Sequence, residues 1–288
     1  MPDTAPASAF ESIEAPPLLY GTAWKEETTQ RLTELALKQG FRGIDTANQR
    51  RHYHEVAVGE AIAASIASGI VCRDELFLQT KFTFRAGQDD RLPYDPTAPI
   101  ATQVKQSFES SLKHLKTERV DSYLLHGPSV RSGLAADDWA AWEAIEAIHD
   151  EGRARRIGVS NVDVMQLELL CHKARIRPHI VQNRCYAVLG WDGLVRRFCA
   201  ANGIRYQGFS LLTANQQVLA RPELQQMARR YNRSPGQLIF RFAIDLGVTP
   251  LTGTTSVEHM RDDLDVFSFR LEPTEIQLIE TLGLKENV

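Results

Sequence analysis

Residues 41–81, FRGIDTANQRRHYHEVAVGEAIAASIASGIVCRDELFLQTK, contain a complete strand–helix–strand pattern. The runs FRGIDT and LFLQTK are short, contain aromatic and β-branched residues, and are typical of buried strands. Between them, VAVGEAIAASIASG repeats apolar residues at the 3.6-residue period of a helix and ends on glycine. Because strands joined through a helical crossover run parallel, this stretch predicts a βαβ unit.

The same alternation continues along most of the chain. The clearest helix start is Ser234-Pro235-Gly236-Gln237, which combines an N-cap, a first-turn proline and a capping-box glutamine. Alternation of this kind predicts an α/β fold, either closed as a (β/α)8 TIM barrel or opened as a doubly wound sheet. Eight strand candidates and the lack of a GxGxxG turn after the first favour a single-domain barrel. The candidates are residues 18–22, 41–46, 76–81, 121–126, 155–160, 179–183, 205–210 and 248–253.

Composition narrows the class of protein. The chain has 288 residues, 43% of them hydrophobic, and a formal net charge of -3 with scattered basic residues. These values give no electrostatic reason to expect a nucleic acid or an anionic membrane as a partner. No apolar stretch approaches 18 residues, so no membrane span is expected. We expect residues 1–16 to form a mobile or loosely docked arm and residues 17–288 to form the barrel.

The spacing of the cysteines bears on the redox compartment of the protein. The four cysteines are far apart and form neither a CxxC pair nor a cluster with histidines, so we expect reduced thiols and no metal site. The N-terminus lacks the basic start and apolar run of a secretory signal. A cytoplasmic protein is therefore the simplest expectation.

Four polar residues lie at or just beyond the ends of successive apolar runs. Asp45 follows FRGI, Tyr53 lies a little further on, Lys81 follows LFLQT and His126 follows YLL. If these runs are parallel strands of one barrel, their C-terminal ends converge on the face where barrel enzymes carry their chemistry. A carboxylate, a phenol, an ammonium and an imidazole on that face predict a proton-transfer site.

Several short motifs extend this pattern. GIDTA with VGEAI downstream, QTK, LLHGPS, IGVSN, VQN and FSLL occur in the order and spacing of the aldo-keto reductases, which the chain resembles from about Leu18 to about Leu264. The resemblance implies a (β/α)8 barrel, a nicotinamide dinucleotide bound without a Rossmann motif, and reversible carbonyl reduction. The expected partner is a small-molecule carbonyl or alcohol, whose identity the sequence does not predict, and the oligomeric state is equally open.

The four polar residues suit that chemistry. Hydride delivered to a carbonyl carbon leaves charge on oxygen, so a donor must protonate that oxygen. A phenol, with a free pKa near 10, needs help to do so. An ammonium about 4 Å away favours the phenolate by roughly 4 kcal/mol, or about three pK units before desolvation. We therefore expect Lys81 to lower the pKa of Tyr53, Asp45 to pair with Lys81, and His126 to bond the carbonyl oxygen.

The choice of phenol needs an argument, because the spacing departs from the family. Members typically read DTAxxYxNE, whereas here the tyrosine position of that pattern is Arg50. Counting back from Val58-Gly59 instead puts His52 at the usual place and Tyr53 one residue later. We assign Tyr53, because a histidine cannot replace a phenol without altering the proton chemistry.

The resemblance also assigns cofactor contacts. Residues of IGVSN and VQN would hold the nicotinamide carboxamide, Phe209 would stack on its ring, FSLL would approach the pyrophosphate, and the loop after the eighth strand would bind phosphate at a helix N-terminus. The residues so assigned are Gly21, Thr22, Ala23, Asp45, Ser160, Asn161, Gln182, Phe209, Ser210, Leu212, Gly253, Thr254, Thr255, His259 and Asp263.

One departure concerns the choice of dinucleotide. Many members grip the 2′-phosphate of NADPH with a lysine and an arginine, whose positions here are Gly253 or Thr254 and His259. Arg261 is a candidate substitute, although an arginine on a helix surface is more often solvated. We expect NADPH on family grounds, with a weakened preference, and NADH as the alternative.

Other functions remain open at this stage. Asp45 and Lys81 can be a structural ion pair, His126 a histidine bonded to backbone, and Tyr53 a loop aromatic. A regulatory or scaffold barrel that binds the cofactor with little turnover is the main alternative, and the altered spacing around Tyr53 supports it. An isomerase or lyase on the same barrel is weaker, since it leaves the nicotinamide motifs unexplained.

Overall fold

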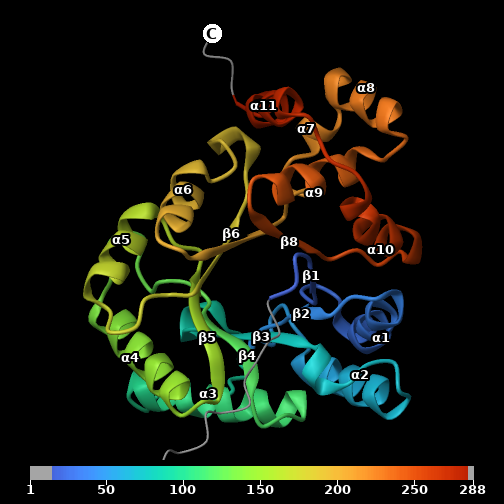
Figure 1. The fold of residues 1–288 in the computed structure, drawn as a ribbon. Coiled ribbons are helices and arrows are strands. Elements are labelled where there is room, and N and C mark those ends of the chain that lie inside the picture. Colours follow the sequence, from blue (N-terminus) through green and yellow to red (C-terminus); the bar gives the residue numbers. More distant parts are fainter. Residues whose placement is uncertain (1–14, 285–288) are drawn as a thin grey trace, which may run out of the picture.

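The computed structural model describes residues 15–284 and shows eight parallel strands closed into a barrel (Figure 1). Each strand pairs with its neighbours in chain order, and β1 closes the barrel by pairing with β8 as well as β2. The predicted single-domain TIM barrel is therefore confirmed, and every predicted strand overlaps an observed one. The strands are β1 Leu19–Gly21, β2 Gly43–Asp45, β3 Phe77–Phe82, β4 Val120–Leu125, β5 Ala154–Ser160, β6 Ile180–Arg184, β7 Arg205–Phe209 and β8 Val248–Thr252.

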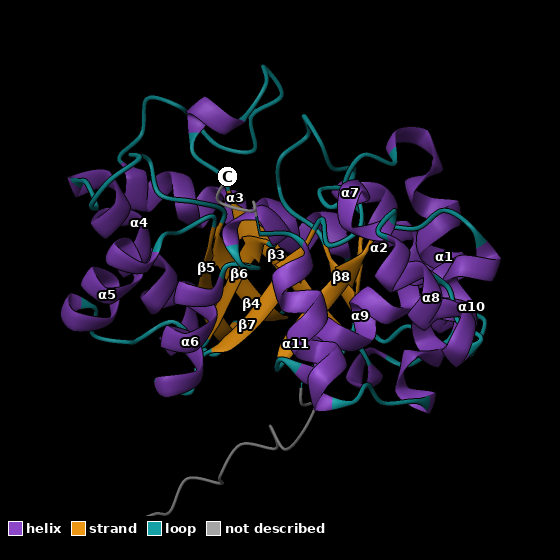
Figure 2. Ribbon diagram, turned by 90° about the horizontal axis from the view of Figure 1, so that it is seen from above, coloured by secondary structure: helices purple, strands orange, loops and turns teal. Residues whose placement is uncertain are grey.

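Helices surround the strands on the outside of the barrel (Figure 2). The capping box predicted at Ser234 is present: the Gln237 backbone N–H donates to Ser234 Oγ at 3.2 Å, and the Ser234 N–H donates to Gln237 Oε1 at 2.9 Å. The helices are α1 Thr29–Gln39, α2 Glu55–Ala67, α3 Ile100–Leu115, α4 Ala136–Asp150, α5 Val164–Lys173, α6 Gly193–Ala201, α7 Gln216–Leu219, α8 Pro222–Tyr231, α9 Pro235–Asp245, α10 Val257–Leu264 and α11 Pro273–Leu282.

The two-residue period of each strand divides its side chains between the barrel interior and the helices. In β3, Leu78 and Phe82 belong to the large core between strands and helices, whereas Phe77 belongs to a small interior core with Leu19 and Ile180. Gln79 and Lys81 follow Phe77 on the interior face. The interior therefore changes from apolar to polar toward the C-terminal ends of the strands.

The N-terminal arm can be judged only in part. Residues 1–14 lie outside the described residues. Of the described residues of the arm, Ala15 has its side chain buried in the interior core, and its carbonyl accepts a hydrogen bond of 2.6 Å from Arg205. The chain is thus docked to the barrel from at least Ala15.

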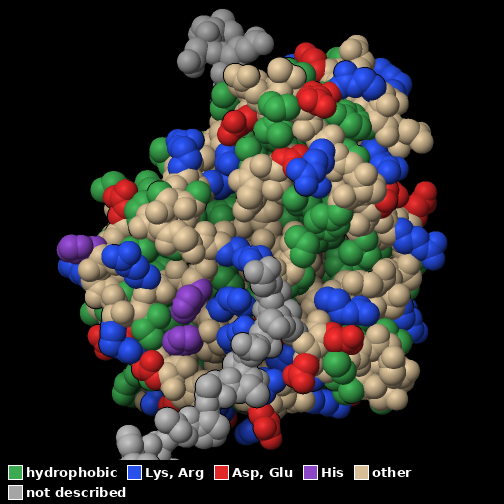
Figure 3. All heavy atoms as spheres, viewed as in Figure 1, with side chains coloured by type: hydrophobic (Ala, Val, Ile, Leu, Met, Phe, Trp, Pro, Cys, Tyr) green, Lys and Arg blue, Asp and Glu red, His purple; other side chains and the backbone are tan. Residues whose placement is uncertain are grey.

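Charged side chains of both signs are distributed over the surface. Basic and acidic side chains are interspersed on the face shown in Figure 3, as expected from their scatter in the sequence. Among the helices of residues 15–284, none is long and apolar enough to cross a membrane.

Gly59 offers a test of the helix layer, because α2 touches α3 there. A Cβ at this position would lie 1.9 Å from the carbonyl oxygen of His114. We predict that Gly59→Ala lowers the free energy of unfolding by about 1–3 kcal/mol despite the better helix propensity of alanine. Gly193→Ala in α6 is the matched control, because its new methyl meets only the ends of flexible arginine side chains. Equal urea midpoints for Gly59→Ala and the wild type would contradict this.

Candidate active site

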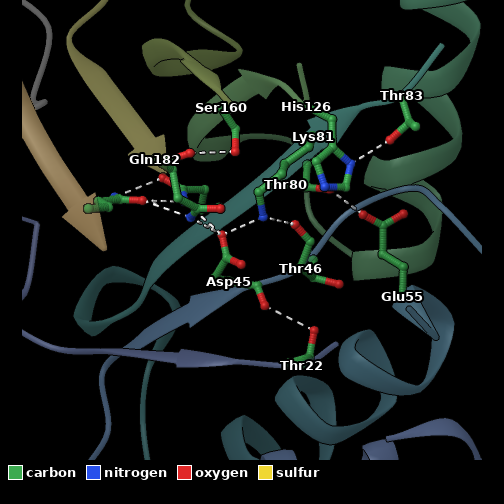
Figure 4. Close-up of polar contacts among 12 residues, drawn as sticks. Thr22, Asp45, Thr46, Glu55, Thr80, Lys81, Thr83, His126, Ser160 and Gln182 are labelled. Carbon is green, nitrogen blue, oxygen red and sulfur yellow. Dashed lines mark hydrogen bonds and ion pairs between the residues drawn. The ribbon is translucent and has the colours of Figure 1, made fainter. Parts of the chain in front are cut away.

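The centre of the site is a buried ion pair. Lys81 Nζ lies 2.6 Å from Asp45 Oδ1 and donates a second bond of 2.9 Å to the carbonyl of Thr46, and both side chains are almost inaccessible (Figure 4). Burial lowers the pKa of Lys81, whereas the charge and hydrogen bond of Asp45 oppose that shift. The pairing expected from the sequence is therefore present.

Tyr53, and not His52, lies beside this pair. The Tyr53 ring centroid is 5.5 Å from Lys81 Nζ and 5.9 Å from the ring centroid of His126. The ring of His52 instead stacks on the exposed side chain of Trp24 at 3.9 Å. The extra residues form a turn in which the Gln49 carbonyl accepts from the backbone N–H groups of both His52 and Tyr53, so the tyrosine is carried into the cluster.

The electrostatics of the phenol differ from the expectation. The pKa of Tyr53 is raised, not lowered, because burial disfavours the phenolate and the Asp45 carboxylate repels it. The charge of Lys81 is largely compensated by Asp45 at 2.6 Å, so the phenol faces a nearly neutral pair. The expected acidification by Lys81 is therefore wrong, and Tyr53 carries its proton at neutral pH.

His126 follows β4 and is a neutral imidazole. Burial, helped by the nearby charges of Lys81 and His52, lowers the pKa of His126 to about 3. Its Nδ1 lies 2.7 Å from the hydroxyl of Thr83. With that hydroxyl donating to Nδ1, the ring hydrogen resides on Nε2, which leaves a neutral donor for a ligand.

The residues assigned to the carboxamide meet next to this cluster. Ser160 Oγ donates to the Gln182 carbonyl at 2.6 Å, and Asn161 Nδ2 donates to the His126 carbonyl at 2.8 Å. Gln182 Nε2 donates to Asp45 Oδ1 and to Gln207 Oε1, each at 2.9 Å. The residues expected to bind the cofactor, at the end of β5 and in β6, are thus joined by hydrogen bonds to Asp45 and to the backbone of His126.

At the end of β7 the placement is partly unexpected. Phe209 is half exposed, and the guanidinium of Arg184 lies over its ring at 5.4 Å from the centroid. Ser210 has a left-handed backbone with φ of 57°, which turns the chain out of the strand. Leu212 packs against the large core. The ring of Phe209, which was expected to stack on the nicotinamide, therefore also contacts the guanidinium of Arg184, a residue that the sequence did not point to.

The loops after β1 and β8 meet through Lys25. This buried lysine donates from Nζ to the carbonyl of Gly253 at 2.6 Å, and burial lowers its pKa to about 8. Gly253 and Thr255 are exposed, and Thr254 is half exposed. By contrast, Thr22 is fully buried, and its hydroxyl donates a hydrogen bond of 2.9 Å to the Asp45 carbonyl. Gly21 and Ala23 offer no polar side chain, and the Thr22 backbone N–H also donates to the Asp45 carbonyl at 3.0 Å, so this loop could contact a ligand only through its remaining backbone groups.

Three further residues, all in α10, differ in how far a ligand could reach their side chains. Asp263 is buried, accepts a bond of 2.6 Å from Thr252 and has a pKa raised to about 6 by burial, so its carboxylate faces the protein. His259 is exposed, and its backbone N–H is capped by Ser256. Arg261 donates to Gln39 of α1 at 2.9 Å, so it is turned away from the loop after β8.

Sequence reasoning missed Lys25, Thr83, Gln79 and Gln207. A usable signal existed for Gln79, because it precedes Lys81 by two residues in a strand and must share its interior face. Gln207 stands two residues before Phe209 and obeys the same rule. Lys25 carried no such signal, since only the fold brings it to the loop after β8.

Comparison with known proteins agrees with this geometry. Residues 18–283 match the Aldo/keto reductase family. An uncharacterized oxidoreductase, YtbE, of Bacillus subtilis is 30% identical over 97% of this chain and 93% of its own length. The human aldo-keto reductase family 1 member C1 is 30% identical over 89% of this chain and 82% of its own. The crystal structure of the Bombyx mori aldo-keto reductase AKR2E4 in complex with NADP superposes with a TM-score of 0.78 at 27% identity, covering 93% of this chain and 89% of that one. The chain therefore belongs to the aldo/keto reductase family and is an NAD(P)H-dependent oxidoreductase.

Proposed function

We propose that this protein reduces the carbonyl group of a small aldehyde or ketone at the expense of NADPH, with Tyr53 as the proton donor. One observation carries the proposal: Tyr53, Lys81, His126 and the Asp45 carboxylate gather at the C-terminal ends of β2, β3 and β4. The proximity of the Tyr53 ring to Lys81 Nζ and to the His126 ring supports turnover over a purely regulatory role.

The residues would divide the chemistry as follows. A bound nicotinamide dinucleotide supplies the hydride that reduces the carbonyl carbon. Tyr53 gives its hydroxyl proton to the carbonyl oxygen, and the ammonium of Lys81 stabilises the phenolate left behind until it takes up a proton again. His126 Nε2–H donates a hydrogen bond to the same oxygen without adding charge. Asp45 fixes the ammonium in place.

The site fits a nicotinamide dinucleotide. Both hydrogens of Gln182 Nε2 are engaged by Asp45 and Gln207, so its Oε1 is the atom left to accept from a carboxamide. Asn161 is exposed beside it, and Phe209 offers a half-exposed ring. At the other end, exposed backbone and hydroxyl groups of residues 253–255 lie before α10, whose N-terminus favours phosphate.

The preference for NADPH would depend on Lys25 in this protein. Its ammonium reaches the loop after β8, where Arg261 does not point and where Gly253 and Thr254 provide no cation. An ammonium with little access to water interacts strongly with a phosphate brought beside it. NADH remains the alternative cofactor if Lys25 serves only to join the two loops.

The role of Tyr53 predicts a selective loss of activity. Tyr53→Phe should lower kcat for aldehyde reduction by at least about 100-fold, because within residues 15–284 Tyr53 is the phenol found beside Lys81, while the dissociation constant for NADPH changes little. NADPH oxidation followed by absorbance, with fluorescence quenching for binding, measures both. Tyr231→Phe, between α8 and α11, is the matched control and should retain activity. Turnover of Tyr53→Phe at the wild-type rate would exclude this tyrosine as the acid.

The neutrality of His126 predicts a flat pH profile. Since its pKa is about 3, protonation of His126 should cause no step in kcat between about pH 5 and 8. The measurement is kcat for reduction over that range in the wild type and in His126→Gln. A step with a midpoint near 6.5 in the wild type that vanishes in His126→Gln would show that the imidazole titrates normally and contradict the neutral-donor role.

Lys25 predicts cofactor discrimination. Lys25→Met should weaken NADPH binding by about tenfold and NADH binding by less, so that the ratio of kcat/KM for the two cofactors moves toward one. Lys38→Met, an exposed lysine in the last turn of α1, controls for the loss of positive charge. An unchanged ratio in Lys25→Met, or a wild type that already prefers NADH, would assign Lys25 to loop joining alone.

A further inference from the structure

Four side chains form a closed ring of hydrogen bonds inside the barrel. Gln79 Nε2 donates to Asp45 Oδ1 at 2.7 Å and to Gln207 Oε1 at 2.8 Å, and Gln182 Nε2 donates to the same two oxygens at 2.9 Å each. Gln207 Nε2 returns a bond of 3.1 Å to Gln79 Oε1. All four side chains are buried. Figure 4 shows Gln182 and Asp45 facing each other in this cluster.

The ring joins opposite walls of the barrel. Asp45 and Gln79 are register partners in β2 and β3, and Gln182 and Gln207 are register partners in β6 and β7. Each bridging bond therefore crosses the interior between two strand pairs that are not neighbours in the sheet. The strands that carry the ion pair and those that carry the cofactor residues are held together at this level.

The carboxylate dictates the direction of every amide. Asp45 can only accept when ionised, so Gln79 and Gln182 must both turn their NH₂ groups toward it. Gln207 must then present its oxygen to both NH₂ groups, which leaves its own NH₂ for Gln79 Oε1. Rotating any amide by 180° would place oxygen against oxygen in a buried site. The remaining oxygen, Gln182 Oε1, is consequently fixed as an acceptor outside the ring.

We propose that Gln79 and Gln207 are positioning residues that hold Asp45 on Lys81 and lock Gln182 Oε1 toward the nicotinamide, so that proton donation and cofactor binding share one hydrogen-bond ring. The proposal rests on the proposed function, since it assigns Gln182 to the carboxamide. Neither residue needs to touch substrate or cofactor. Barrel interiors at such levels are usually filled by branched apolar side chains, so fold stability alone does not require two amides here.

The test replaces both amides with apolar side chains of similar length. In the Gln79→Met/Gln207→Met variant, the bonds between the two amides disappear together. Asp45 loses one donor but keeps Lys81 and Gln182, and Gln182 loses one acceptor, so folding should be nearly preserved, with Tm within about 5 °C of the wild type. NADPH should bind about tenfold more weakly, because Gln182 is free to turn, and kcat should fall by a similar factor. Leu124→Met, an interior core substitution outside the ring, should change neither quantity.

Other outcomes overturn the proposal. A double variant that binds and turns over like the wild type would show that the ring only fills space, and an equal loss in Leu124→Met would show a general sensitivity of the core. If the double variant does not fold, Gln207→Met alone decides, because it leaves the bonds of Asp45 to Gln79, Gln182 and Lys81 in place. Unchanged NADPH affinity in that variant rejects the ring as a positioning device.

The binding readout separates this proposal from the proposed function. A wild type that binds NADPH but reduces no carbonyl would reject carbonyl reduction, while the comparison of dissociation constants among the variants would still decide the ring. A wild type that binds neither NADPH nor NADH would reject both.

Discussion

The pairing of Lys81 with Asp45 is the constraint around which the site is organised. Burying two charges costs several kcal/mol per ion, and their attraction repays that only when further hydrogen bonds satisfy the remaining lone pairs and protons. Here Asp45 Oδ1 accepts from Lys81, Gln79 and Gln182, and the ammonium also donates to the Thr46 carbonyl. A buried ion pair is weak evidence for stability. The free-energy cost of burying Asp45 and Lys81 is therefore better explained by the chemistry proposed for this end of the barrel.

The barrel supplies that environment through the alternation of its strands. From the N-terminal end, β3 presents Phe77, then Gln79, then Lys81 to the interior, so an apolar floor gives way to an amide layer and then to a charged one. The amide layer forms hydrogen bonds with the charged layer in place of bulk water. Burial disfavours the charged forms of both groups, and for this reason a neutral imidazole and a protonated phenol persist beside the Lys81–Asp45 pair.

Sequence periodicity predicted the fold because each strand and helix is locally consistent, as Ser234 and its capping box illustrate. The meeting of Asp45, Lys81 and His126 was also predictable, since each stands at or just beyond the C-terminal end of a strand. The choice between His52 and Tyr53 rested on chemistry, because the turn centred on Gln49 depends on tertiary contacts such as its 2.6 Å bond to the Gly87 carbonyl. The predicted direction of the Tyr53 pKa shift was wrong, because the sequence shows neither how deeply the phenol is buried nor how Asp45 compensates the charge of Lys81. The sequence also did not predict Lys25 or the glutamine ring, because their partners lie far apart along the chain and meet only in the closed barrel.

The raised pKa of Tyr53 bears on the direction of the reaction. A phenol that holds its proton at neutral pH is ready to donate to a carbonyl oxygen, whereas oxidation of an alcohol requires the phenolate as a base. The cofactor ratio sets the equilibrium, but in the proposed mechanism a Tyr53 that is protonated at neutral pH favours reduction, and oxidation would need more alkaline conditions.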